Sequence, residues 1–177
     1  DIFQDIGYSV QQTSDGYIIL GSQTISGLGK EIWLIKTDSL GNMTWDKTFG
    51  NIFLDIGYSV QQTSDGGYVL TGDTDSFSPT GIDVLLIKTD SLGNMIWNKT
   101  FGGNSVDNGR AVQQTSDGGY ILVGDTLSFG NSPGTFYDAW LIKIGPDNVC
   151  GDSYINVGVE QCDDGNTNNG DGCSATC

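Results

Sequence analysis

QQTSDG occurs three times in the chain, at residues 11–16, 61–66 and 113–118. A second block follows each copy and keeps the same phase. An internal period of about fifty residues indicates that one supersecondary unit is repeated and stacked, so the repeat largely determines the fold. The copies of the second block are IWLIKTDSLGN at 32–42, VLLIKTDSLGN at 84–94 and the shorter AWLIKIG at 139–145.

The second unit indicates how one repeat is built. Asp-Gly and Gly-Gly supply the positive φ angles that hairpin turns need, so 64–67 is expected to turn the chain between two strands. A second turn is expected at 90–94, and a variable loop at 75–82, which is rich in Ser, Pro and Gly. Each complete unit is therefore predicted to be a four-stranded antiparallel meander. In the second unit the expected strands are 57–63, 68–74, 83–89 and 95–101.

The third expected strand of each unit is apolar along its whole length, at 32–35, 84–87 and 139–142. A strand without alternation is covered on both faces, which happens when sheets stack face to face. Units of this length packed sheet on sheet describe β-propeller blades, with an open β-solenoid-like stack or a sandwich as the alternatives. We predict an all-β fold of three propeller-like blades and a small disulfide-stapled module. The expected boundaries are 1–50, 51–102 and 103–146 for the blades, the last lacking its fourth strand, and 147–177 for the module.

The units resemble the propeller-type repeats of secreted bacterial and archaeal proteins. The shared segments are TSDGGYVLTGDT at 63–74, DVLLIKTDSLGN at 83–94, TSDGGYILVGDT at 115–126 and DAWLIK at 138–143. The first unit departs from the pattern, with Ser22 in place of Asp73 and Asp125, and Glu31 in place of Asp83 and Asp138. Such repeats usually belong to long surface proteins without assigned chemistry. The resemblance therefore implies a fold and an extracellular or cell-surface location rather than an activity.

The cysteines are confined to the end of the chain, at Cys150, Cys162, Cys173 and Cys177. An even number in a short segment rich in Asn, Gly and Asp predicts two disulfides and an oxidising compartment. A zinc site is the weaker alternative, because the chain has no CxxC pair and no His. Through CGD at 150–152, EQCDDGN at 160–166 and DGCSATC at 171–177, the tail resembles a short disulfide repeat of myxobacterial and other secreted proteins. Three pairings of the cysteines remain open.

The tail also holds a set of oxygen-bearing side chains in a Gly-rich segment: Asp163, Asp164, Asn166, Asn168 and Asp171. Alternating oxygen ligands are typical of Ca²⁺ loops, although Gly170 comes one place late for an EF-hand and no Glu follows. The alternative is a loop of side-chain-capped turns. Ca²⁺ is the one cofactor that the sequence suggests, and none is required. Asn42 and Asn98 begin N-glycosylation sequons.

Composition excludes several classes of function. The net charge of −15 argues against nucleic acid and against an anionic membrane surface. No apolar run is long enough for a transmembrane helix. Without His, the chain has no Ser-His-Asp or Cys-His system. Two-carboxylate glycoside hydrolysis is formally open with 20 Asp, but the recurring acids look structural, so we do not expect an enzyme.

Several residues recur once per unit, and for each we favour a structural role. Asp15, Asp65 and Asp117 are expected in turns, and turn geometry alone would explain them. Lys36, Lys88 and Lys143 are expected to pair with an Asp of the same blade. Asp5, Asp55 and Asp107 are expected to accept backbone N–H bonds, with cation binding as the alternative. Trp45 and Trp97 are expected to pack in the core or between blades.

Three blades do not close a ring, since known propellers have at least four. The chain begins in mid-repeat at Asp1, which indicates a processed product or a piece of a longer protein. Either further blades precede it, or copies associate as a filament, as a six-bladed dimer or by lending a strand. We expect a non-catalytic structural or adhesive surface protein that forms homo-oligomers or filaments. The alternatives are a module that binds a glycan or protein through the loops at 25–30, 75–82 and 127–137, or a fragment of a larger secreted enzyme.

Overall fold

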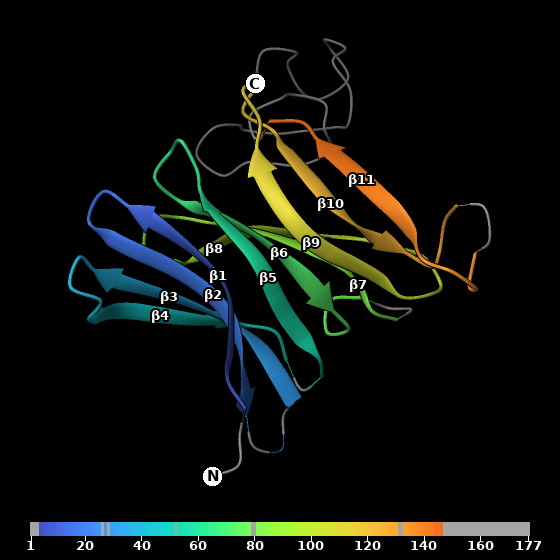
Figure 1. Cartoon of the computed structure of the whole chain (residues 1–177), viewed down its shortest axis with the longest axis horizontal. Coiled ribbons are helices and arrows are strands. Elements are labelled where there is room, and N and C mark those ends of the chain that lie inside the picture. The colour runs from blue at the N-terminus through green and yellow to red at the C-terminus, as the bar shows by residue number, and fades with distance from the viewer. Residues whose placement is uncertain are drawn as a thin grey trace, which may run out of the picture.

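The computed structural model describes residues 4–25, 27, 29–51, 53–78, 81–130 and 133–146. Within these ranges the protein consists of eleven strands joined by turns and loops (Figure 1). The same ranges contain no helix, and so none that is long and apolar enough to cross a membrane. The predicted all-β fold is confirmed.

The strands form three antiparallel sheets, one for each copy of the repeat, and follow chain order across each sheet. Sheet 1 contains β1 (Ile6–Thr13), β2 (Gly16–Ile25), β3 (Gly29–Asp38) and β4 (Met43–Phe49). Sheet 2 contains β5 (Asp55–Gln62), β6 (Tyr68–Thr74), β7 (Asp83–Thr89) and β8 (Met95–Phe101). Sheet 3 contains β9 (Asp107–Gln114), β10 (Tyr120–Thr126) and β11 (Asp138–Ile144), with no fourth strand among the described residues.

Turn chemistry places the strand ends of the second unit where the sequence predicts them. Strands β6, β7 and β8 have the expected bounds, whereas β5 begins two residues earlier than expected, at Asp55, and ends one residue earlier, at Gln62. In the first turn Gly66 has a φ of 85°, and Asp65 Oδ1 accepts the Gly67 N–H at 3.0 Å and the Thr63 hydroxyl at 2.5 Å. The side chain of Asp65 therefore closes the turn, as Asp does in many hairpins.

One glycine in the second strand of each sheet allows two backbones to approach closely. A Cβ at Gly72 would overlap the carbonyl oxygen of Ile56 in the first strand. The pairing register shifts there, between Gly57 and Ser59, as at a β-bulge. Gly21 and Gly124 meet the first strands of their own sheets in the same way. The glycine before Asp73 in GDT is therefore required by a backbone contact.

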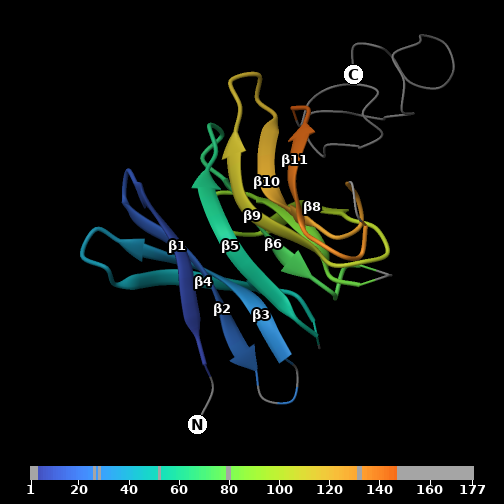
Figure 2. The same ribbon diagram turned by 45° about the vertical axis from the view of Figure 1, so that its right-hand side comes forward.

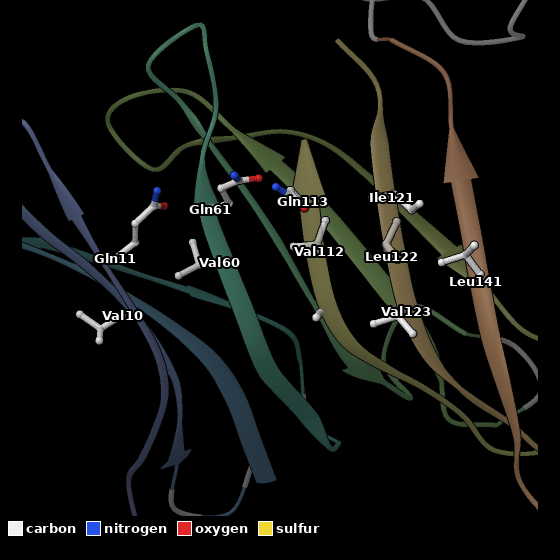
Figure 3. A pocket seen from close by; sticks show the side chains of 11 residues that line it. Val10, Gln11, Val60, Gln61, Val112, Gln113, Ile121, Leu122, Val123 and Leu141 are labelled. Carbon is white, nitrogen blue, oxygen red and sulfur yellow. The ribbon is translucent and has the colours of Figure 1, made fainter. Parts of the chain in front are cut away.

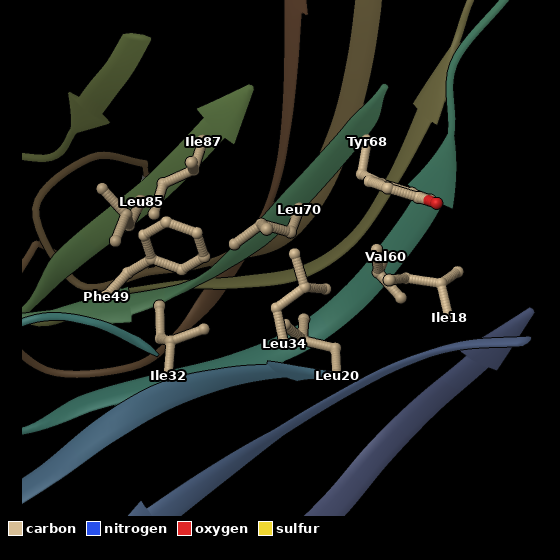
Figure 4. Close-up of a cluster of buried hydrophobic side chains, with 10 residues drawn as sticks. All are labelled: Ile18, Leu20, Ile32, Leu34, Phe49, Val60, Tyr68, Leu70, Leu85 and Ile87. Atoms are coloured by element: carbon tan, nitrogen blue, oxygen red, sulfur yellow. The ribbon is translucent and has the colours of Figure 1, made fainter. Parts of the chain in front are cut away.

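The three sheets pack face to face in chain order. Between sheets 1 and 2 lies a cluster of buried side chains that includes Ile18, Leu34, Phe49, Leu70 and Leu85 (Figure 4). A second cluster lies between sheets 2 and 3 and consists of Val69, Val84, Leu86, Trp97, Val112, Tyr120 and Leu122. Sheet 2 is thus covered on both sides, and every residue of β6 and β7 is buried.

The first strands of the three sheets lie side by side, with β5 between β1 and β9 (Figures 1 and 2). Each of the later first strands also packs across the preceding sheet: β5 contacts β2 and β3, and β9 contacts β6 and β7. A first strand therefore serves as the contact element between one sheet and the sheet before it.

The prediction that the third strand is covered on both faces holds for β7 only. In β11, which has the same apolar pattern, burial alternates and Leu141 is 64% exposed. In β3 one side is buried and the other is half-buried. The reason is position, because sheets 1 and 3 each have a neighbouring sheet on one side only within the described chain. The apolar pattern of β3 and β11 therefore goes beyond what their contacts in the described chain require.

Candidate functional site

The two sheet faces that have no neighbouring sheet among the described residues form the candidate site. We call the side of a sheet that points toward the next sheet in sequence its forward face, and the opposite side its rear face. The forward face of sheet 1 packs on sheet 2, and that of sheet 2 packs on sheet 3. The uncovered surfaces are the forward face of sheet 3, with Ile121, Val123, Ala139 and Leu141, and the rear face of sheet 1, with Tyr17, Ile19, Trp33 and Ile35.

Residues at equivalent repeat positions show how strongly burial depends on the neighbouring sheet. On the forward faces, Leu34 and Leu86 are 0% exposed, whereas Leu141 at the same position is 64% exposed. On the first strands, Val60 is 6% and Val112 8% exposed, whereas Val10 is 66% exposed. Leu141 and Val10 thus occupy repeat positions that are buried between sheets elsewhere in the protein. Each of them lies on one of the two uncovered faces.

Both uncovered faces are hollowed. A cavity of about 500 Å³ lies where the three first strands meet the forward face of sheet 3 (Figure 3). Its lining consists of Val10, Gln11, Val60, Gln61, Ala111, Val112, Gln113, Ile121, Leu122, Val123 and Leu141. A smaller cavity of about 210 Å³ lies on the rear face of sheet 1, between Asp5, Ile6, Gly7, Ile19, Gly21, Trp33 and Ile35. A mainly apolar lining with a few polar groups is typical of a binding cavity.

The first Gln of each QQTSDG links its strand to the next first strand. Gln11 Oε1 accepts the backbone N–H of Gln62 at 2.6 Å, and Gln61 Oε1 accepts that of Gln114 at 2.5 Å. The link was not predicted from the sequence, although its signal is there: the same Gln occurs in all three copies. Figure 3 shows Gln113 at the same place on β9, the last first strand of the described chain.

A serine two residues earlier repeats the link in two of the three units. Ser9 Oγ accepts the N–H of Val60, and Ser59 Oγ accepts that of Val112, each at 3.3 Å. These bonds and those of the glutamines advance in step along both strands, so neighbouring first strands run in the same direction. Ala111 stands at the serine position of β9 and has no hydroxyl to offer.

Sheet 3 differs from the other sheets at one more position on its first strand. Arg110 stands where β1 and β5 have Tyr8 and Tyr58. Its guanidinium lies 5.0 Å from the centre of the Tyr58 ring and pairs with Asp125 at 2.8 Å. In sheet 2 the equivalent carboxylate, Asp73, instead accepts the N–H of Gly109 from sheet 3, at 3.0 Å.

Two groups at this junction have strongly shifted pKa values. Burial raises the pKa of Asp73 to about 6, against the lowering effect of the Gly109 N–H that it accepts. Burial also raises the pKa of Tyr58 to about 12, with a further contribution from the negative charge of Asp73. Both shifts arise mainly from burial at the packed junction between sheets. Burial in a structural contact shifts pKa values as strongly as an active site does, so these shifts do not by themselves indicate catalysis.

The recurring Lys residues pair with the turn Asp of their own sheet, as predicted. The three N–O distances are 2.8 Å for Lys36 and Asp15, 2.7 Å for Lys88 and Asp65, and 2.9 Å for Lys143 and Asp117. Turn geometry alone is therefore an incomplete account of these Asp residues. Although burial acts in the opposite direction, the hydrogen bonds from Lys88 and Thr63 hold the pKa of the Asp65 carboxyl below its usual value.

The Asp residues near the start of each first strand accept both backbone and hydroxyl hydrogen bonds. Asp55 accepts the Asn51 N–H at 3.1 Å and the hydroxyls of Thr74 and Ser76 at 2.5 Å. Asp107 accepts the equivalent bonds in sheet 3. Asp5 accepts the N–H of Thr24 at 3.2 Å. The expected N–H bonds are present, and the hydroxyl partners are an addition that sequence reasoning missed.

The two tryptophans pack between sheets, as expected. Trp45 meets Tyr68 of sheet 2 edge to face, with ring centroids 6.0 Å apart. Trp97 meets Tyr120 of sheet 3 in the same way, at 5.8 Å. Each junction between two sheets therefore contains one Trp–Tyr pair that contributes to its packing.

The sequon residues differ in setting. Asn42 is exposed in the turn after β3, where its amide donates to Asp38 Oδ2 at 2.9 Å. Asn98 lies within β8 and donates to Met95 Sδ at 3.6 Å. The predicted disulfide cysteines and the acidic residues 163–171 lie outside the described residues.

Comparison with known proteins concerns the end of the chain alone. A family model described as "Domain of unknown function (DUF4215)" matches residues 144–177. This range contains all four cysteines. No curated protein matches the chain.

Proposed function

We propose that this protein is a non-catalytic structural or adhesive protein whose stacked sheets act as propeller-like blades. In this proposal the array continues from sheet 3 into sheet 1 of a second copy. The single observation that carries it is the exposure of Leu141 and Val10, whose repeat equivalents are buried at both internal junctions. An exposed apolar sheet face of this kind is typical of an interaction surface.

The internal junctions supply the docking geometry for the second copy. Strands β5 and β9 each pack across the second and third strands of the preceding sheet. The corresponding place on sheet 3 is the surface of β10 and β11, where the cavity of about 500 Å³ lies. Strand β1 of the second copy would lie across β10 and β11 at the edge of this space, with Val10 against the forward face and the Gln12 N–H opposite Gln113.

Such a contact is heterologous, because one copy contributes its forward face and the other its rear face. Heterologous contacts extend into filaments unless the rotation between copies closes a ring. Two copies would provide six blades, which lies within the range of closed propellers. Both outcomes make the function a property of the assembly.

An extracellular or cell-surface location is part of the proposal. It is supported by the resemblance of the repeats to those of secreted proteins and by the tail with its four cysteines. The proposed absence of catalysis is supported by the lack of His and by recurring acids that close turns or cap strands.

Light scattering coupled to size-exclusion chromatography tests the proposal with the full chain. Wild type is expected to elute as dimers or larger species, and Leu141→Asp as a monomer with unchanged circular dichroism. Leu92→Asp is the matched control, because Leu92 is 62% exposed in the turn after β7, away from both faces. A monomeric wild type at high concentration would refute self-association.

A second candidate is a module that binds a glycan or a protein through its variable loops. It is favoured by a cavity of about 390 Å³ formed by Gly103, Asn104, Ser105, Leu127, Ser128, Phe129, Pro133 and Gly134. Part of this lining belongs to the loop at 127–137 that breaks the repeat. Saturable binding of a glycan by the monomeric Leu141→Asp variant, lost in Phe129→Ala, would support this candidate.

A further inference from the structure

Two buried carboxylates face each other at the junction of sheets 2 and 3. Asp83 begins β7, Asp107 begins β9, and they are 5% and 0% exposed. Gly102 lies between them: a Cβ there would overlap Asp83 Oδ1 and would lie 2.9 Å from Asp107 Oδ2. One oxygen of each side chain therefore borders the same small space.

The hydrogen bonds around this space leave one oxygen without a partner. Asp107 Oδ2 accepts the Ser128 hydroxyl at 2.6 Å and the Gly103 N–H at 2.9 Å. Asp83 Oδ2 accepts the Ser78 hydroxyl at 2.6 Å. Asp83 Oδ1 is buried and has no hydrogen-bond partner among the described residues.

The charge is also left unbalanced. The ion pairs of the described residues involve Asp15, Asp65, Asp117 and Asp125, and none includes Asp83 or Asp107. Two like charges in a buried site disfavour each other unless a proton or a cation compensates them. Consistent with this, burial and then the charge of Asp107 raise the pKa of Asp83.

We propose that Asp83 Oδ1 and Asp107 Oδ2 bind a divalent cation of the Ca²⁺ class at the junction of sheets 2 and 3. Hard oxygen donors without His or Cys suit Ca²⁺, whose remaining ligands would be backbone carbonyl oxygens and water. A proton on Asp83 is the alternative way to compensate the charge, and the experiment below distinguishes it from a cation. The cation would join sheet 2 to sheet 3, and the proposal does not depend on association between copies.

Calcium titration of the full chain, after treatment with EDTA, tests this site. The probe is Ca²⁺ alone, followed by isothermal calorimetry and by thermal unfolding. Wild type is expected to gain roughly 5–10 °C in Tm at a free Ca²⁺ concentration about a hundredfold above Kd. Asp83→Asn is expected to bind one Ca²⁺ fewer per chain and to lose most of that gain.

Glu31→Gln is the matched control, because Glu31 holds the position of Asp83 in sheet 1 and is only half-buried. It should retain the wild-type stoichiometry, and both variants keep every acidic residue of the tail. Equal stoichiometry and equal Ca²⁺ response in Asp83→Asn and wild type would overturn the proposal. So would a wild type whose Tm does not respond to Ca²⁺ and whose gain in Tm on acidification is reduced in Asp83→Asn, which is the outcome expected for a proton on Asp83.

If Asp83→Asn does not fold, crystals of wild type grown with Tb³⁺ in place of Ca²⁺ give an independent answer. An anomalous peak bordered by Asp83 and Asp107 supports the site. Peaks elsewhere with none at this junction refute it.

Discussion

The three Lys–Asp pairs form an internal series in which the same interaction is buried to different degrees. The side chain of Lys88 is 2% exposed, whereas that of Lys143 is 43% exposed. Asp65→Asn removes the charge facing Lys88 and keeps an oxygen for the Thr63 and Gly67 bonds that close the turn. The Lys88 ammonium then keeps its hydrogen bond to the Thr89 carbonyl, at 2.9 Å, without a facing negative charge.

The expected cost of Asp65→Asn is about 2–3 kcal/mol of unfolding free energy. Removing one partner of a fully buried pair costs ~3–5 kcal/mol, and the lower value applies because Asp65 itself is 57% exposed and water can reach its place. In a chain of 177 residues this corresponds to a fall in Tm of roughly 5–10 °C. Asp117→Asn should leave Tm unchanged within error, because water already hydrates the Lys143 ammonium.

Urea unfolding at pH 7, followed by tryptophan fluorescence, gives the free energy of unfolding of both variants in the same assay. The ion pair also makes stability depend on pH. Because the pKa of Asp65 is lowered in the folded protein, its contribution is present above the ordinary Asp value of 3.8 and is lost as the pH falls below it. The difference between wild type and Asp65→Asn should therefore shrink in acid. Equal costs for Asp65→Asn and Asp117→Asn would refute the assignment of the effect to burial of the Lys partner.

Two further predictions concern the junctions. Gln61→Ala should lower the free energy of unfolding by about 1 kcal/mol in chemical denaturation, because it deprives the Gln114 N–H of its acceptor. Gln113→Ala should leave the stability of the monomer unchanged and weaken self-association, which light scattering would reveal. Asp73→Asn should remove a pH dependence of stability. Because the folded pKa of Asp73 is about 6, wild type takes up a proton on folding, and its free energy of unfolding should fall by about 3 kcal/mol as the pH rises from about 4 to 6. Calorimetric Tm values across that range would detect the fall in wild type and its absence in the variant. A variant whose Tm falls as steeply as that of wild type would contradict the assignment to Asp73.

Local chemistry explains why the strands could be predicted from the sequence. The bounds of β6, β7 and β8 follow from turns that Asp65, Gly66 and Asp90 close with their own side chains or φ angles. The Lys–Asp pairs follow from a repeated polar residue at the end of an apolar strand. These features depend on residues that are close in sequence or paired within one sheet.

Burial could not be predicted in the same way, because it depends on neighbouring sheets. Strands β7 and β11 have the same pattern, yet Leu86 is buried and Leu141 is exposed. The bond from Gln61 to Gln114 was missed for the same reason, since it joins two sheets. The ion pair between Arg110 and Asp125 was not predicted either, because Arg110 stands where the other two units have tyrosine.

Cross-linking between separately labelled chains tests the head-to-tail contact most directly. Val10→Cys and Leu141→Cys would be prepared as two full-length proteins, mixed, and treated with a short bis-maleimide. The proposed contact predicts a cross-linked dimer in the mixture, with far less in either protein alone. A symmetric contact would cross-link one variant with itself, and no cross-link in the mixture would contradict the proposal that sheet 3 of one copy receives sheet 1 of the next.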